Sequence, residues 1–85
     1  MKQYIVKQID TATENNPNFA GKTETWFMGK GGYGKREIKW LPKGGWSRKC
    51  FAEQYIEKCK KYSEELKKHG GEYWTHEYEI LEIER

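Results

Sequence analysis

The sequence has no long apolar run, and this shortage excludes a membrane-spanning protein. Its longest uninterrupted apolar stretch is only a few residues, whereas a helix that crosses a bilayer needs about 20. The first ten residues, MKQYIVKQID, also lack the apolar segment of a secretory signal. We therefore expect a cytoplasmic protein that has no membrane partner.

Cysteine is scarce as well, and its placement argues against a disulfide or a metal site. Cys50 and Cys59 are the only two cysteines. On one helix they would lie about 13 Å apart along the axis, but a disulfide requires Cα atoms within about 7 Å. We expect two reduced thiols, with Cys59 in the core and Cys50 near the start of a helix. Together with His69 and His76 they match no usual zinc spacing, so we expect no metal.

Neither sign of charge dominates, since 16 basic and 13 acidic residues give a net charge of +3. The charges are interspersed, which suits a mild preference for anionic partners but does not indicate DNA binding by itself. A chain of 85 residues is long enough for a single small domain, residues 1–85. Hydrophobic residues make up only 35% of the chain, but 15% are aromatic, and large rings can close a small core.

Local patterns predict four strands and one helix. Residues 3–9 and 22–28 are rich in β-branched and aromatic side chains and predict strands. Residues 35–41 alternate, with Arg36, Ile38 and Trp40 on one face, and predict the second half of a hairpin spanning 22–41. Residues 72–84 alternate until Leu81 and Ile83 shift the pattern, which indicates either a bulge or burial on both faces. This acidic strand could pair with the strand at 3–9 or with that at 35–41. Residues 11–22 and 29–34 predict loops.

A helix is predicted between two glycine pairs. Ser47 is the expected N-cap, with Trp46 and Phe51 in the hydrophobic-staple positions, and Gly70-Gly71 the expected end. The expected core-facing stripe consists of Phe51, Tyr55, Ile56, Cys59, Tyr62 and Leu66. The predicted fold class is therefore α+β, with an antiparallel sheet of about four strands covered on one face by a single helix, in the order β-β-β-α-β.

Two glycine-containing loops carry the candidate binding residues. In the stretch KGGWSRK, Lys43, Trp46, Arg48 and Lys49 surround the expected helix start, which exposes unpaired N–H groups and favours anions. Gly44-Gly45 would let a phosphate or carboxylate approach the backbone, or could simply form a turn. In the stretch GKGGYGKR, the candidates are Lys30, Tyr33, Lys35 and Arg36. Rings and cations together can stack on bases and neutralise phosphates, although the loop could also be an unoccupied turn.

Catalytic signatures are missing from the sequence. There is no nucleophile motif and no Walker pattern. A lone strand histidine such as His76 is more often structural than catalytic, and Cys50 has no identifiable general-base partner. We expect no enzyme activity, no catalytic residue and no cofactor. Surplus tryptophan and tyrosine side chains near basic residues are instead typical of binding hot spots.

The stretches GWSRKCFAEQYIEK and YWTHEYEILEIE resemble small proteins of phages and mobile elements of Gram-positive bacteria. In these proteins a tryptophan-containing loop leads into one helix and then a closing strand, and the group includes anti-CRISPR and other anti-defence inhibitors. The resemblance covers about the last half of the chain and rests on architecture. It implies tight, non-enzymatic binding that occludes a host protein or ribonucleoprotein in the host cytoplasm. Many anti-CRISPR proteins are acidic DNA mimics, and the positive net charge argues against that mode.

Two further partners remain open from the sequence. The basic glycine-rich loops could instead bind nucleic acid or a nucleotide, and an exposed edge strand could pair two copies of the chain.

Overall fold

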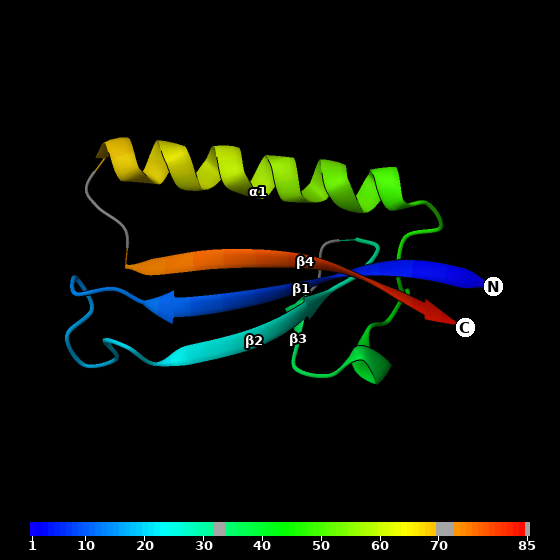
Figure 1. Cartoon of the computed structure of the whole chain (residues 1–85), viewed down its shortest axis with the longest axis horizontal. Helices are drawn as coiled ribbons and strands as arrows, with labels where there is room; N and C mark the ends of the chain where they lie inside the picture. The colour runs from blue at the N-terminus through cyan, green and yellow to red at the C-terminus, as the bar shows by residue number, and fades with distance from the viewer. Residues whose placement is uncertain (32–33, 70–72, 85) are drawn as a thin grey trace.

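The computed structural model describes residues 1–31, 34–69 and 73–84, and its order of elements is that of an α+β fold (Figure 1). The strands are β1 (Lys2–Ala12), β2 (Thr23–Met28), β3 (Gly34–Lys35) and β4 (Trp74–Glu84), and the helix is α1 (Lys49–His69). A short 3-10 turn, η1 (Ile38–Trp40), lies between β3 and α1. The four strands form one antiparallel sheet in the order β3-β2-β1-β4, which confirms the predicted fold class.

Strand β4 pairs with β1, which is one of the two inner strands of the sheet. The two strands pair without interruption from Lys2–Glu84 to Ala12–Trp74. Because this register has no extra residue, the bulge considered for the end of β4 is absent there. The shift in the pattern instead corresponds to partial burial of Ile80 on one face and of Leu81 and Ile83 on the other. Lys2 also forms an ion pair with Glu82 at 3.7 Å, as expected for a basic strand beside an acidic one.

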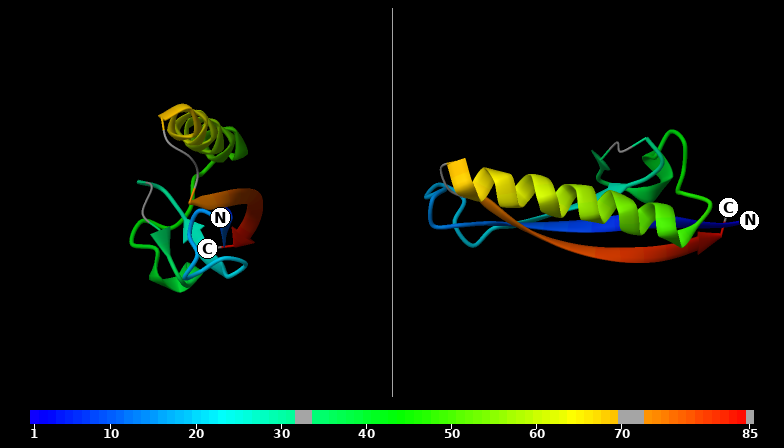
Figure 2. Two further views of the ribbon diagram at one scale, coloured as in Figure 1. Left: turned by 90° about the vertical axis from the view of Figure 1, so that its left-hand side faces the viewer. Right: turned by 90° about the horizontal axis from the view of Figure 1, so that it is seen from above.

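The core lies on both faces of β1. Ile5 and Val6 are both fully buried, and successive side chains of a strand point to opposite faces of its sheet. Val6 lies opposite Ile80, which borders a pocket shared with α1, so Val6 is on the face that the helix covers. The turn η1 and the segment that follows it lie on the other side of the sheet (Figures 1 and 2). Leu41, at the end of η1, is the second buried side chain of that far side. The sheet is therefore covered by the helix on one face and, at one end, by a loop on the other.

Helix α1 approaches the sheet along a narrower stripe than the sequence predicts. It begins at Lys49, two residues after the expected cap Ser47. Ala52 is its buried residue, and a small side chain at this position lets the helix backbone come close to β1. The helix residues that are half-buried follow Ala52 at three- and four-residue spacing: Tyr55, Ile56, Cys59 and Ser63.

Three residues that were expected in the core are exposed instead. Phe51, Tyr62 and Leu66 are 42%, 64% and 47% exposed. Phe51 and Tyr62 lie about a quarter of a turn around the helix from Ala52. Leu66 lies only about 40° from Ala52, but it comes after Ser63, the last half-buried residue of the helix. Of the two predicted staple residues, Phe51 is exposed, and Trp46 packs its ring against that of Tyr55, with centroids 5.2 Å apart. The expected helix stop at Gly70-Gly71 lies outside the described residues.

The predicted strand at 35–41 is wrong beyond its first residue. Strand β3 has two residues, paired as Phe27–Lys35 and Met28–Gly34, and the chain then leaves the sheet. By turning through η1, the chain brings Leu41 into the far-side core. The long loop after β1 is also shorter than predicted, because Thr11 and Ala12 belong to the strand.

Candidate functional site

The Gly44-Gly45 bend is packed against the protein's own backbone. The amide of Gly45 donates to Oε1 of Gln3 at 3.1 Å, and the amide of Gly44 donates to the carbonyl of Leu41 at 3.3 Å. A Cβ at Gly45 would lie 2.6 Å from the carbonyl oxygen of Tyr4, so the glycine is needed for this close approach. The two amides therefore serve the fold, and they are not free to cradle a phosphate as the sequence suggested.

The eight predicted binding residues do not form one cluster. Lys30 and Trp46 line one groove, and Lys49 lines another on the opposite side of α1. Lys43 and Arg48 are exposed, and Lys35 is half-buried in β3. Tyr33 lies outside the described residues. The remaining member, Arg36, has a structural role.

Arg36 holds β2 in place. Its guanidinium carbon lies 4.0 Å from the ring centroid of Trp26, and its Nη2 is 3.3 Å from Oε1 of Glu24. Its Nη1 also donates to the carbonyl of Thr25 at 3.4 Å. A cation over a tryptophan ring with a carboxylate beside it is a stabilising arrangement. The positive charge of Arg36 is therefore already used within the sheet.

The loop groove is the place where the two predicted binding loops meet. It has a volume of about 500 Å³ and runs between the β2–β3 loop and the first half of α1. Its lining consists of Lys30, Gly31, Trp46, Phe51, Gln54, Tyr55 and Lys58. Three of these residues are aromatic and two are lysines, so the groove offers apolar contact area together with positive charge. Phe51, Tyr55 and Lys58 were not among the predicted site residues, although their spacing from one another along the helix could have indicated a shared side.

The apolar flank of α1, formed by Phe51, Tyr55, Tyr62 and Leu66, continues from the loop groove along the helix. Residues spaced by three and four share one side of a helix. Burial raises the pKa of the Tyr55 hydroxyl well above its usual value, and the neighbouring Cys59 adds to the shift. Tyr55 thus anchors the flank to the core, while the other three members expose large apolar surfaces.

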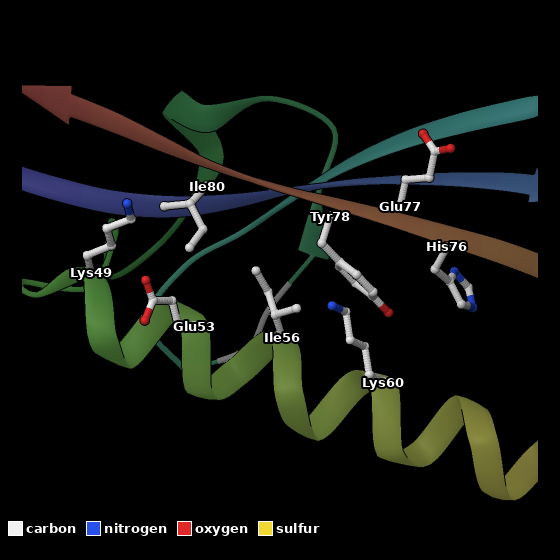
Figure 3. Close-up of a pocket in the computed structure, with 8 residues that line it drawn as sticks. All are labelled: Lys49, Glu53, Ile56, Lys60, His76, Glu77, Tyr78 and Ile80. Atoms are coloured by element: carbon white, nitrogen blue, oxygen red, sulfur yellow. The ribbon is translucent and has the colours of Figure 1, made fainter.

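The β4 groove lies on the other side of α1, between the helix and β4 (Figure 3). It has a volume of about 820 Å³. Its helix wall is polar apart from one residue and consists of Lys49, Glu53, Ile56 and Lys60. On the strand wall, His76, Tyr78 and Ile80 point toward the helix, whereas Glu77 points away from it (Figure 3).

A polar cluster that the sequence did not predict surrounds His76, one of the residues that line the β4 groove. The register sets Asp10 opposite His76, and their Oδ1 and Nδ1 atoms are 2.5 Å apart. Gln8 donates to Asp10 at 2.8 Å and lies 3.4 Å from the same histidine nitrogen. Within the described residues, His76 hydrogen-bonds only to these two side chains, so it cross-links β1 to β4. Burial, with a contribution from Cys59, raises the pKa of Tyr78 to about 12.

Among the described residues, no group of three or more His, Cys, Asp or Glu side chains could hold a metal ion. The described part of the chain also has no helix that is both long and apolar enough to cross a membrane. No protein-family model matches this chain, and no curated protein or solved structure matches it either.

Proposed function

We propose that this protein acts without catalysis, by binding one partner macromolecule through the loop groove and the apolar flank of α1. The observation that carries the proposal is the exposure of Phe51, Tyr62 and Leu66 on one side of a single helix. Contiguous exposed apolar surface bordered by polar residues is typical of protein-binding sites. The flank meets a groove containing Trp46, and tryptophan and tyrosine are enriched among the residues that dominate binding energy.

Binding at the apolar flank is favourable because it removes the exposed side chains of Phe51, Tyr62 and Leu66 from water. Burying apolar area contributes roughly 25 cal/mol per Å², and the stripe centred on Ala52 leaves these three side chains uncovered. A partner that covers them would gain this contribution without any rearrangement of the sheet. Because the surface is mainly apolar, we expect affinity for a protein partner to change little with salt.

The resemblance to small phage proteins makes a bacterial host protein or ribonucleoprotein, such as a defence complex, the first class of partner to test. We propose that the chain inhibits it by covering part of its surface. The experiment is affinity purification of the tagged chain from a lysate of a Gram-positive bacterium, with a parallel purification of the double variant Tyr62→Ala, Leu66→Ala. Both side chains are largely exposed, so the double variant should fold.

We expect the wild type to retain one protein in stoichiometric amount and the double variant to lose it. The matched control is Lys61→Ala, because Lys61 lies about 100° around the helix from Tyr62 and about 140° from Leu66, outside the flank. Retention of the same protein by the double variant would contradict the proposed surface, and the absence of any stoichiometric partner would contradict the proposed function.

The lysines of the loop groove favour nucleic acid as a second candidate partner. Lys30 and Lys58 stand beside the rings of Trp46, Phe51 and Tyr55. Such a combination stacks bases and neutralises the backbone of a single strand. In this case affinity for a fluorescent single-stranded oligonucleotide should fall steeply between about 50 and 200 mM salt. The variant Lys30→Ala, Lys58→Ala should reduce the magnitude of the log–log salt slope by about 1.4, whereas Lys61→Ala should not. Binding that does not depend on salt would exclude this candidate.

A further inference from the structure

Strand β4 is an edge strand along its whole length. It pairs with β1 from Trp74 to Glu84, and it is the last strand in the sheet order. In the described residues, no other strand pairs with its outer side. An edge of this kind exposes a row of N–H and C=O groups that can pair with another chain.

The register identifies which residues of β4 present these groups. The amide of Thr13 donates to the carbonyl of Tyr73 at 3.0 Å, and this pair continues the β1–β4 register by one step. In an antiparallel pair, hydrogen-bonded residues alternate with non-bonded ones. The odd-numbered residues of β4 therefore bond to β1, and the even-numbered residues point their backbone groups outward. The hydrogen bonds of β1 support this assignment. The amides of its even-numbered residues Tyr4 and Ala12 donate to the carbonyls of Trp46 and Lys22, on the side of β1 away from β4.

The same even-numbered residues line the β4 groove with their side chains. His76, Tyr78 and Ile80 face α1, so both their backbone groups and their side chains border one open space (Figure 3). Ile56 stands opposite them on the helix. The volume of about 820 Å³ is within the range of known ligand sites, about 300–1,000 Å³. A sheet edge beside a helix is an arrangement that can accept an extended peptide by strand addition.

We propose that the β4 groove binds an extended segment of a partner protein as an added antiparallel strand whose residues alternate between apolar and basic. Directly opposite residues of neighbouring antiparallel strands point to the same face. Segment residues opposite Tyr78 and Ile80 face α1 and meet Ile56, so these positions take apolar side chains. Segment residues opposite Glu77 and Glu79 lie on the other face, where both glutamates are exposed, so these positions take lysine or arginine.

Charge also argues against a second copy of this chain as the occupant. Strand β4 carries glutamate at positions 77, 79, 82 and 84. An antiparallel pair of two copies centred on Tyr78 sets Glu77 of each copy against Glu79 of the other, and like charges directly opposite are destabilising. This inference does not depend on the proposed function, because the two surfaces lie on opposite sides of α1.

The test is hydrogen exchange of the intact chain, measured by NMR, with a synthetic capped peptide in which valine and lysine alternate. With free peptide at ten times its dissociation constant, exchange of the outward amides of Tyr78 and Ile80 should slow by about tenfold. Exchange of the amides of Glu77 and Glu79, which already bond to β1, should change much less. A peptide of the same composition with its valines and lysines in separate blocks serves as the control and should give no such protection.

A charge reversal tests the recognition on the outer face. Glu77 lies opposite Ile9 in the sheet, so Glu77→Lys removes no cross-strand ion pair. This variant should bind the valine–lysine peptide about two- to tenfold more weakly and should bind a valine–glutamate peptide more tightly than the wild type does. The proposal is overturned if the peptide does not bind, if bound peptide leaves the outward amides unprotected, or if the blocked peptide protects them equally. It is also overturned if these amides become protected only as the chain dimerises, which would make a second copy the occupant.

Discussion

The substitution Gly29→Ala tests whether the bend at 41–46 packs on the end of β2 as the structure shows. A Cβ at position 29 would lie 2.0 Å from the carbonyl oxygen of Gly44, at least 1.0 Å closer than real Cβ atoms approach. The obstacle is a backbone atom, so no rotamer change can relieve it. The same oxygen accepts a hydrogen bond from the amide of Lys30 at 3.0 Å. Relief of the clash must move Gly44 away and weaken this bond.

The expected cost follows from these two effects. Overpacking costs about 1–3 kcal/mol, and the lost hydrogen bond costs about 0.5–1.5 kcal/mol. The reduced freedom of the unfolded chain returns about 0.4–1 kcal/mol. The net loss should be about 2–3 kcal/mol, a large share of the roughly 4–13 kcal/mol expected for a chain of this length. The midpoint of thermal unfolding should fall by about 10–20 °C.

The assay is urea unfolding followed by tryptophan fluorescence, with circular dichroism for the thermal midpoint. Gly34→Ala is the matched control, because a Cβ at that position meets only side-chain atoms, the nearest being Sδ of Met28 at 3.0 Å. A flexible thioether can move aside, so this substitution should cost less than about 1 kcal/mol. Equal stability of the two variants would refute the close packing of residue 29 against the bend.

Three further predictions concern individual side chains. For Tyr78, whose pKa rises from 10.0 to about 12 on folding, the unfolded chain loses its proton first as the pH increases. Stability should therefore be complete below pH 10 and decline between pH 10 and 12, and Tyr78→Phe should make that decline shallower in urea titrations at pH 9, 10 and 11. Replacement of His76 by alanine leaves Asp10 without its closest partner, so it should cost about 1–2 kcal/mol in urea unfolding; no loss would show that the cross-link is dispensable. Substitution of Arg36 by alanine should cost about 1 kcal/mol and by lysine somewhat less, since lysine keeps the charge but not the planar stacking on Trp26; equal stability of wild type and both variants would contradict this role.

The parts of the fold that depend on neighbouring residues along the chain were predictable. Strands β1 and β4 and helix α1 each have a repeating pattern of apolar residues, and such a pattern needs no distant partner to be recognised. The short β3 and the turn η1 were not predictable, because they depend on Arg36 folding back over Trp26, ten residues earlier. The candidate site was predictable only in part. Lys30 and Trp46 do meet in one groove, but Arg36 and the Gly44-Gly45 bend serve the fold instead.

The sequence alone determined the class of fold, since alternation specifies strands and three- and four-residue spacing specifies a helix. Only the tertiary structure decided which side of that helix is buried. The apolar positions of α1 span more than the width that one sheet can cover, so several stripes were compatible with the pattern. Ala52 at the contact lets the backbone approach β1 closely, and this leaves Phe51 and Tyr62 about a quarter of a turn to one side. Leu66 is exposed because it lies beyond Ser63, the last half-buried residue of the helix. The exposed surface proposed for binding is therefore a consequence of packing, and the local pattern could not reveal it.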